Sequence, residues 1–421
     1  MHMIYLFYLL LYFLHVFRLV LSQVFILIPH HRKDFELKNL EQTACRSFKQ
    51  DKVIADFCFE VSSEGELEQV RPLFLYYLHQ GKKMELIFSS PSVESKCIAL
   101  QSQYPEQVRI FRLPLITPQF LNKWITAPVV LFCRYDFFPE LLLLKLSGKK
   151  FILLSGAVKK NNWFKSRVFG LFDIIVAATT REAERFKNIN PKAQVFSFDF
   201  RIQRINERWM KAPDTLSAIP VLQSYLAFLK TIPQEDRIII GSAWPSDLAI
   251  FNNSEFIEDI KKSKVHILLV PHQLGKESIR VIQDYLIKLG LRDDVSVLSE
   301  NKKTTAITIL NMSGVLCELY GLFSESYIGG GYERSIHSVF EPFFSGNQVY
   351  VGPKIHRSTE YDLLAEIAPH EIHVLFHPEQ FYTIYMNNKN KSLDLNLRNL
   401  WRLEAAVKIE EIAKAITQVA S

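Results

Sequence analysis

Residues 321–353, GLFSESYIGGGYERSIHSVFEPFFSGNQVYVGP, join two short apolar runs through three consecutive glycines and a helix-like segment. The runs ESYI and QVYV predict two strands with a helix between them, a parallel unit whose sheet needs helices on both faces. A helix beginning near Ile336 would place His337 and Glu341 on one face. The glycines allow a ligand close to the backbone, and the amides of a helix start favour an anion. The alternative is a plain strand–helix turn with a solvated glutamate.

The same alternation of short apolar strands and helical segments runs from about residue 53 onward, and a proline-containing helical stretch interrupts it between about Ile205 and Asp236. A chain of 421 residues is too long for one ordinary core. We therefore expect an α/β protein with two doubly wound Rossmann-like domains facing a cleft, the design of the GT-B glycosyltransferases. The predicted ranges are 45–205 for the N-terminal domain, 206–235 for a linker, 236–395 for the C-terminal domain and 396–421 for a C-terminal helix.

Residues 1–33 depart from this pattern. Nearly every residue from Ile4 to Ile28 is apolar, and the run is long enough for a bilayer. No basic segment precedes it and no small-residue cleavage site follows, so it is not typical of a signal peptide. We expect a membrane anchor, either spanning or interfacial, rather than a core helix. The basic cluster at residues 30–33 predicts that the following domains stay on the cytoplasmic side.

Composition excludes several other classes. The net charge of +6 is spread along the chain without a basic block, so a nucleic-acid partner is not indicated. The five cysteines are scattered and contain no CxxC pair, which argues against a disulfide framework and a zinc site. The sequence has no cluster of carboxylates at the end of a predicted strand, so it gives no indication of a metal site.

Two further strand ends in the second half carry small or polar residues. The segment IIIGSAWPSD ends a strand at Gly241-Ser242, whose hydroxyl and amides suit a phosphate. The segment ILLVPHQ ends another at Pro271-His272. Taken alone, His272 is better explained as a loop histidine with a structural hydrogen bond. Because these ends and the triple glycine converge on one crevice in a doubly wound sheet, together they favour a ligand site.

In the first half, two strand ends carry candidate polar residues. The segment SSEGE places Glu66 at a turn that opens a helix, where it is either a helix-start carboxylate or a general base with a pKa raised by desolvation. The segment CRYDFFPELL places Arg134 and Asp136 after another strand. The alternative there is an ion pair beside a packed Phe137-Phe138 corner.

In this order, the motifs resemble those of the 3-deoxy-D-manno-octulosonate (Kdo) transferases of lipopolysaccharide assembly, from residue 3 to about residue 380. The likeness is most specific in the second half, in GSAWPSD, PH, the MSG segment with LY, and GGGY…IHSVFEP followed by GP. In the first half, SEGE, RYDFFP and DFRI are similar to the family's S-V-G-E, E-x-E-[LF]-W-P and G-D-x-R-[FY] patterns. The chain departs from the family on this acceptor side, where Glu60 replaces a histidine, Glu64 a valine, Arg134 a glutamate and Ala157 an arginine.

The resemblance implies an inverting glycosyltransferase that moves Kdo from CMP-Kdo to a hydroxyl of a lipid A precursor of the lipid IVA type, without a metal or other cofactor. It implies Glu66 as the general base. The donor-binding residues that it implies are Ser242, Pro271, His272, Met312, Gly314, Gly329, Gly330, Gly331, His337, Ser338 and Glu341. The acceptor-side residues are Ser63, Gly65, Arg134, Asp136, Lys159 and Lys160.

The expected location is the inner membrane, with both catalytic domains on its cytoplasmic side and the lipid acceptor and membrane surface as partners. Two other interpretations stay open. One is a catalytically silent, membrane-associated GT-B protein, and the other is a transferase or epimerase that acts on a different nucleotide sugar.

Overall fold

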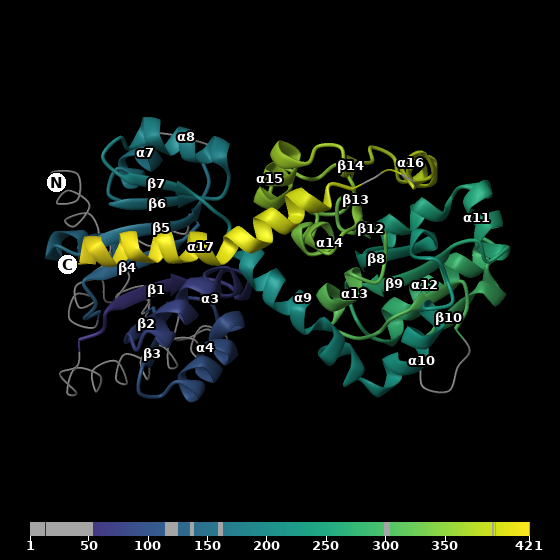
Figure 1. Ribbon diagram of the computed structural model, residues 1–421, viewed down its shortest axis with the longest axis horizontal. Coiled ribbons are helices and arrows are strands. Elements are labelled where there is room, and N and C mark those ends of the chain that lie inside the picture. Colours follow the sequence, from purple (N-terminus) through teal and green to yellow (C-terminus); the bar gives the residue numbers. More distant parts are fainter. Residues whose placement is uncertain are drawn as a thin grey trace. The chain divides into compact units, whose positions relative to one another are not determined.

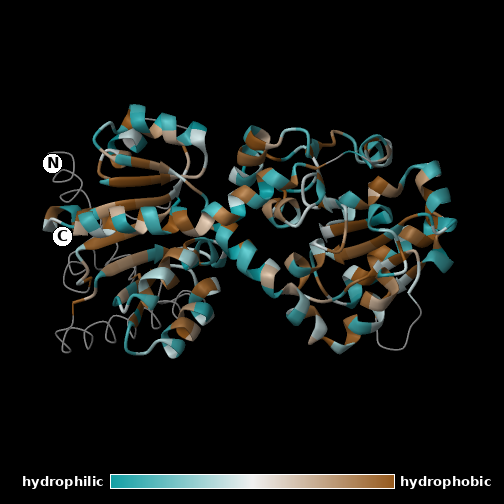
Figure 2. Cartoon of the chain, viewed as in Figure 1, coloured by the Kyte–Doolittle hydropathy of each residue, from teal (hydrophilic) through white to brown (hydrophobic). Residues whose placement is uncertain are grey.

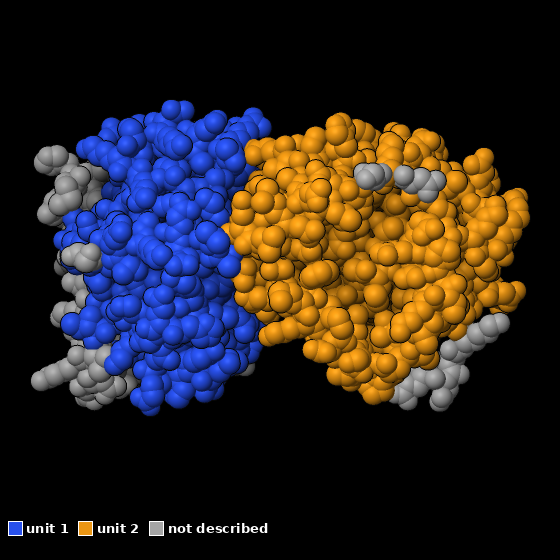
Figure 3. Space-filling view, viewed as in Figure 1, with its two compact units in different colours: residues 1–201, 406–421 blue, residues 202–405 orange. Residues whose placement is uncertain are grey.

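The computed structural model describes residues 13, 54–113, 125–134, 139–158, 163–298, 304–389, 391 and 393–420. The chain forms two compact units, residues 1–201 with 406–421, and residues 202–405 (Figures 1 and 3). Apart from Phe13, the predicted anchor at residues 1–33 lies outside the described residues. Within the ranges that the structure describes, no helix is both long enough and apolar enough to cross a bilayer.

The first unit is built on a seven-stranded parallel sheet with the strand order β3-β2-β1-β4-β5-β6-β7. Its strands are β1 Phe57–Val61, β2 Met84–Phe88, β3 Val108–Arg112, β4 Val129–Cys133, β5 Lys150–Gly156, β6 Ile174–Ala177 and β7 Gln194–Ser197. Its helices are α3 Glu64–His79, α4 Pro91–Gln103, α6 Pro139–Leu142, α7 Trp163–Phe169 and α8 Thr180–Ile189. Strands β1, β2, β4 and β6 are buried along their whole length, as their continuous apolar sequences predict.

The second unit repeats this architecture with the order β10-β11-β9-β8-β12-β13-β14. Its strands are β8 Arg237–Ala243, β9 His266–Pro271, β10 Val295–Val297, β11 Ile307–Ile309, β12 Glu325–Ile328, β13 Gln348–Val351 and β14 Ile372–Val374. Its helices are α9 Arg201–Ser217, α10 Pro220–Leu229, α11 Ser254–Lys261, α12 Lys276–Lys288, α13 Leu316–Tyr320, α14 Phe340–Phe344, α15 Thr359–Ile367 and α16 Phe381–Asn388. The long helix α17, Leu395–Ala420, ends the chain.

Short 3-10 helices complete the two units, at Leu143–Ser147, Gln234–Asp236, Pro245–Phe251, Arg292–Asp294 and Pro378–Gln380. Figure 2 shows apolar strands in the interior of each unit and hydrophilic residues on the outer faces of the helices. Each sheet thus supplies a core of its own, which is what lets each unit stand as a separate α/β layer structure.

Each sheet contains one place where successive connections run in opposite directions. In the first unit this switch lies between β1 and β4, and in the second it lies between β8 and β12. In open α/β sheets the crevice at the carboxyl ends of such strands is where ligands bind. The prediction of two doubly wound domains with parallel sheets is confirmed, and it places the two candidate sites at these switches.

The segment that we expected to be a linker, residues 206–235, has a different organisation. It contains most of α9 and all of α10, and it belongs to the second unit. Pro220 occupies the first turn of α10, where proline suits a helix start, and Pro213 lies within α9. The C-terminal helix begins at Leu395, and its final residues, 406–420, belong to the first unit, where the Tyr77 hydroxyl donates to the Ala413 carbonyl at 3.0 Å.

Candidate functional site

The triple glycine follows β12 at the switch of the second unit, and close backbone contacts surround it. A Cβ on Gly329 would lie 2.2 Å from the Ser242 carbonyl oxygen at the end of β8. A Cβ on Gly331 would lie 2.6 Å from the backbone of Gly352. Gly330 has a φ of 92°, in the left-handed region that glycine adopts without strain. The glycines therefore serve first to let β12 and its two neighbours approach one another.

The buried carboxylate of Asp247 organises this turn from the 3-10 helix that follows β8. It accepts hydrogen bonds from the backbone N–H groups of Trp244, at 2.8 Å, and Gly330, at 2.9 Å, and from the Tyr327 hydroxyl, at 2.7 Å. Burial raises the pKa of the Asp247 carboxyl, and these three hydrogen bonds oppose the shift. The Gly330 amide, which we expected to face a ligand, is thus occupied by a protein carboxylate.

The helix predicted to begin near Ile336 begins instead at Phe340. The preceding residues turn back on the glycines, because the Arg334 N–H donates to the Gly330 carbonyl at 3.1 Å. Pro342 disfavours an earlier start: it has no N–H to offer the carbonyl of Ser338, so a helix running through Ser338 into α14 would lose that hydrogen bond. His337 and Glu341 therefore do not share a helix face, and that prediction was wrong.

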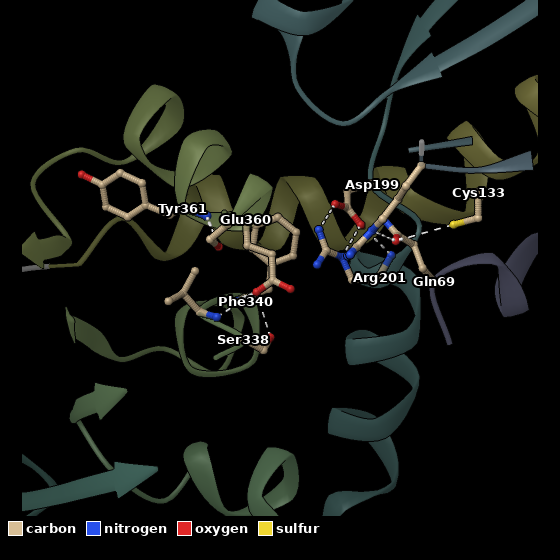
Figure 4. Close-up of polar contacts among 11 residues, drawn as sticks. Gln69, Cys133, Asp199, Arg201, Ser338, Phe340, Glu360 and Tyr361 are labelled. Atoms are coloured by element: carbon tan, nitrogen blue, oxygen red, sulfur yellow. Dashed lines mark hydrogen bonds and ion pairs between the residues drawn. The ribbon is translucent and has the colours of Figure 1, made fainter. Parts of the chain in front are cut away.

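Glu360, from α15, occupies the amides at the start of α14. Its Oε2 accepts from the Ser338 hydroxyl at 2.9 Å and from the N–H groups of Val339 and Phe340 at 2.8 and 3.1 Å (Figure 4). The carboxylate stands where the sequence predicted the anion of a ligand. Ser338, predicted to bind the donor, is held by this internal contact.

Arg208, on α9, connects the predicted donor-binding loop to α14. Its guanidinium donates to both carboxylate oxygens of Glu318, at 2.8 and 2.7 Å, and to the Gly314 carbonyl at 3.0 Å. Its Nη1 also lies 3.6 Å from the Glu341 Oε1. Burial raises the pKa of Glu341 to about 7; Arg208 opposes the shift, whereas Glu360 and Glu318 add to it. Sequence reasoning missed Arg208 because it lay in the predicted linker.

Three aromatic rings meet at the carboxyl ends of β8 and β9. The Trp244 indole stacks on the His272 imidazole with centroids 4.3 Å apart and an interplanar angle of 16°. His272 in turn lies 4.6 Å from His337, whose Nε2 accepts from the Trp244 Nε1 at 3.3 Å. The structure thus brings together two histidines that the sequence singled out separately, and it adds Trp244.

Burial favours the neutral form of both histidines of this cluster. Burial lowers the pKa of His337 to about 4, with a further contribution from His272. Burial and then the Arg334 charge lower the pKa of His272. Because the His337 Nε2 accepts from Trp244, the ring proton of the neutral imidazole resides on Nδ1. Nδ1 is then a donor for a ligand oxygen.

Arg334 is the cation of this region. Its guanidinium lies 5.9 Å from the centroid of the Trp244 ring. No described carboxylate forms an ion pair with it. An exposed guanidinium beside neutral histidines is suited to an anionic group such as a phosphate.

A cavity of about 170 Å³ opens beside the Trp244 and His272 rings. It is lined by Ala243, Trp244, Pro245, Pro271, His272, Gln273, Glu277, Ser278, Val281 and Ile282. Pro271, the last residue of β9, and His272, which follows it, both line this cavity. Met312 and Gly314, which we expected on the same pocket, are not among its lining residues.

In the first unit, Ser63 and Glu66 lie where β1 leads into α3, at the switch of that sheet. The Ser63 hydroxyl caps α3 by accepting from the Glu66 N–H at 3.3 Å. The buried Glu66 carboxylate accepts from the Ser62 N–H at 2.6 Å. This reciprocal pattern is close to a capping box. Glu66 therefore has a structural role at the start of α3, the same turn at which we predicted a catalytic role for it. Gly65 has open space for a Cβ, with the Ser63 hydroxyl oxygen at 4.0 Å as its nearest neighbour.

A polar cluster surrounds Cys133 at the end of β4. Burial raises the pKa of the Cys133 thiol, as do the charges of Glu66 and Glu60, while those of Arg134 and Arg201 lower it. Two carboxylates and two guanidiniums of this unit therefore lie within electrostatic reach of one thiol. Sequence reasoning named Glu66 and Arg134 as functional candidates but not Arg201.

The two guanidiniums of the cluster are held differently. Arg134 has a φ of 63°, and its Nε donates to the Oε1 of the fully buried Gln69 at 2.8 Å. Arg201 forms a two-point contact with the buried Asp199, in which its Nε donates to Oδ1 at 2.9 Å and its Nη2 to Oδ2 at 2.5 Å (Figure 4). Asp136, Lys159 and Lys160, also predicted on the acceptor side, lie outside the described residues.

Residues 33–199 match the family model described as 3-deoxy-D-manno-octulosonic-acid transferase (kdotransferase). Residues 33–199 are therefore a domain of the Kdo transferase family. The domain is that of a glycosyltransferase, and the match includes β1, α3 and all of the polar cluster except Arg201. None of the curated proteins matches the sequence.

Solved structures resemble the chain over both units. The UDP-GlcNAc 2-epimerase from Neisseria meningitidis bound to UDP-GlcNAc has a TM-score of 0.52 at 12% identity, covering 84% of this chain and 100% of that chain. A glycosyltransferase from Rickettsia africae has a TM-score of 0.54 at 11% identity, covering 86% and 98%. At these identities the likeness shows the fold, which is GT-B-like.

The C-terminal CMP-Kdo binding domain of WaaA from Acinetobacter baumannii is also similar, with a TM-score of 0.33 at 14% identity. It covers 52% of this chain and 97% of that chain.

Proposed function

We propose that this Kdo transferase family member is an inverting glycosyltransferase that moves Kdo from CMP-Kdo to a hydroxyl of a lipid A precursor. The observation that carries the proposal is the family domain at residues 33–199, which contains Glu66 at the switch of its sheet. The second unit supports it with a neutral histidine pair, an exposed arginine and a small cavity at the carboxyl ends of β8 and β9.

In this proposal Glu66 is the general base. Its carboxylate takes the proton of the acceptor hydroxyl as that oxygen attacks the anomeric carbon of Kdo, and the bond to the CMP phosphate oxygen breaks on the opposite face. A positioned base of this kind contributes about two to four orders of magnitude in rate. The proposed base already receives a hydrogen bond from the Ser62 N–H, which fixes its orientation on α3.

The second unit holds the leaving nucleotide. The Arg334 guanidinium neutralises the phosphate, and the His337 Nδ1–H donates to one of its oxygens. Glu341 is the proposed acceptor for the ribose hydroxyls, on the assignment that the family resemblance suggests, with Arg208 fixing its side chain. The reaction as proposed needs no cofactor, because CMP is already a good leaving group.

The location and the acceptor belong to the same proposal. We place the protein at the cytoplasmic face of the inner membrane, with residues 1–33 as its anchor. Deleting residues 1–30 is expected to release the protein from membranes while CMP affinity stays unchanged. Continued sedimentation of the truncated chain with membranes would contradict the anchor assignment.

The test of the catalytic assignment pairs two carboxylates of one helix turn. Transfer from CMP-Kdo to a detergent-solubilised lipid A precursor is measured for the wild type, Glu66→Gln and Glu64→Gln. Glu64 is a matched control because it lies two residues away in the first turn of α3, where its exposed carboxylate pairs with Lys96 at 3.0 Å.

Glu66→Gln is expected to lose transfer and to retain CMP binding by calorimetry, whereas Glu64→Gln retains both. Glutamine keeps an oxygen that can accept from the Ser62 N–H, so the helix start is preserved. Near-normal turnover in Glu66→Gln would remove Glu66 from the base role. A wild type that binds no CMP and transfers no Kdo would refute the proposed function.

A further inference from the structure

The cavity beside Trp244 and His272 has a shape and lining that suit one part of a nucleotide. Its volume of about 170 Å³ is below the roughly 300–1,000 Å³ of sites that enclose a drug-sized ligand. A single aromatic ring fits such a space, whereas a whole nucleotide sugar does not. Most of its lining is apolar, from Ala243, Pro245, Pro271, Val281 and Ile282.

The charged residues at and near the cavity indicate which part of a nucleotide the cavity binds. Glu277 lies in the first turn of α12 and lines the cavity together with Ser278. A carboxylate there repels a phosphate. The cation of this region, Arg334, lies at the Trp244 ring, and it is not among the lining residues. The phosphate therefore belongs near Arg334 and the base in the cavity.

We propose that Glu277 makes this cavity selective for cytosine over uracil, so that α12 decides which nucleotide the donor carries. The inference rests on the proposed function, in which the donor is a CMP-sugar. Glu277 lies outside every motif of the family resemblance. The inference therefore gives a role to α12, which forms one wall of the cavity.

The selectivity follows from the hydrogen-bonding edges of the two bases. Cytosine carries an exocyclic amine, and a carboxylate accepts from that amine, as it does when proteins read cytosine in nucleic acids. Uracil presents a carbonyl oxygen at the same position. An ionised glutamate has no proton to donate to it, so the two groups repel each other. Ser278, which can both donate and accept, tolerates either base.

The experiment measures the affinities of CMP and UMP for the full chain by calorimetry. One good base-specific contact discriminates by about 1–3 kcal/mol, so the wild type is expected to prefer CMP by roughly 5- to 150-fold. Glu277→Gln replaces the carboxylate by an amide that offers both an acceptor and a donor. It is therefore expected to bind UMP more tightly than the wild type does and to bring the ratio close to one.

Asp284→Asn is the matched control. Asp284 is an exposed carboxylate on the same helix, near Arg280 at 3.7 Å, and it does not line the cavity. Its variant is expected to keep the wild-type preference. Thermal melting of both variants tests whether α12 is intact, and a structural role for Glu277 would weaken CMP and UMP binding equally.

The outcomes separate the two proposals. A wild type that prefers CMP and a Glu277→Gln variant that keeps the same ratio would overturn the role of Glu277 and leave the proposed function standing. A wild type that binds neither nucleotide, or that prefers UMP, would overturn the CMP-sugar assignment and this inference with it.

Discussion

Replacing Glu341 by glutamine should remove a pH dependence from the stability of the protein. The Glu341 side chain is 25% exposed, and the guanidinium nearest to it is already engaged by both oxygens of Glu318. Burial therefore outweighs the Arg208 charge and raises the pKa of Glu341 to about 7. In the unfolded chain the pKa of a glutamate is about 4.3.

The direction of the pH dependence follows from this difference between the folded and unfolded pKa values of Glu341. Because the folded pKa is raised, the folded state binds the proton more tightly, and the stabilising contribution is fully present below about pH 4. It falls as the pH rises and is lost by about pH 8. A difference of two to three pKa units, at about 1.4 kcal/mol each, corresponds to about 3 kcal/mol in the free energy of unfolding.

Urea unfolding of the full chain between pH 5 and pH 8 measures the effect. Glu341→Gln is expected to gain stability relative to the wild type as the pH rises, by up to about 3 kcal/mol over the full range. Glu333→Gln, which changes an exposed carboxylate of the neighbouring turn, serves as the control and should follow the wild type. Parallel profiles for Glu341→Gln and the wild type would refute the reasoning.

Three further predictions concern residues of the second unit, and one of them uses a glycine of the first unit as its control. Gly329→Ala places a Cβ 2.2 Å from the Ser242 carbonyl oxygen and should lower the free energy of unfolding, measured with denaturant, by about 1–3 kcal/mol. Gly65→Ala is the control, because a Cβ there has open space and should leave the stability unchanged. Equal stabilities of the two variants would contradict the close approach at Gly329. Asp247→Asn puts an amide where three donors converge and should lower stability by about 1–3 kcal/mol, and an unchanged melting temperature would argue against the clamp. Arg334→Gln should weaken CMP binding more at low salt than at high salt, and a salt-independent effect would exclude a role in charge neutralisation.

The positions of the strands along the chain could be predicted from the sequence because the signals for a strand are local. Continuous apolar runs predicted buried parallel strands, and the small or polar residues after them marked the carboxyl ends. The triple glycine, the GS pair and the PH pair all lie at the carboxyl ends of neighbouring strands of the second sheet, β12, β8 and β9. This convergence on one edge needed only the rule for doubly wound sheets.

The contacts of the predicted site residues were not readable, because their partners lie far away along the chain. Asp247 takes the Gly330 amide across 83 residues, and Arg208 reaches Glu318 across 110. No spacing rule connects such pairs. The sequence did contain a local reason against the helix expected near Ile336, since Pro342 has no N–H for a helical hydrogen bond to Ser338.

By itself, the sequence determined the alternation of strands and helices, the two doubly wound sheets and the residues that follow each strand. It did so because backbone hydrogen bonding and apolar burial act over short stretches of chain. Only the tertiary structure decided that Asp247 and Glu360 occupy amides predicted for a ligand, and that Trp244 joins His272 and His337. Those outcomes depend on which side chains the packed elements bring within a few ångströms, where burial and neighbouring charge set the protonation state of each group.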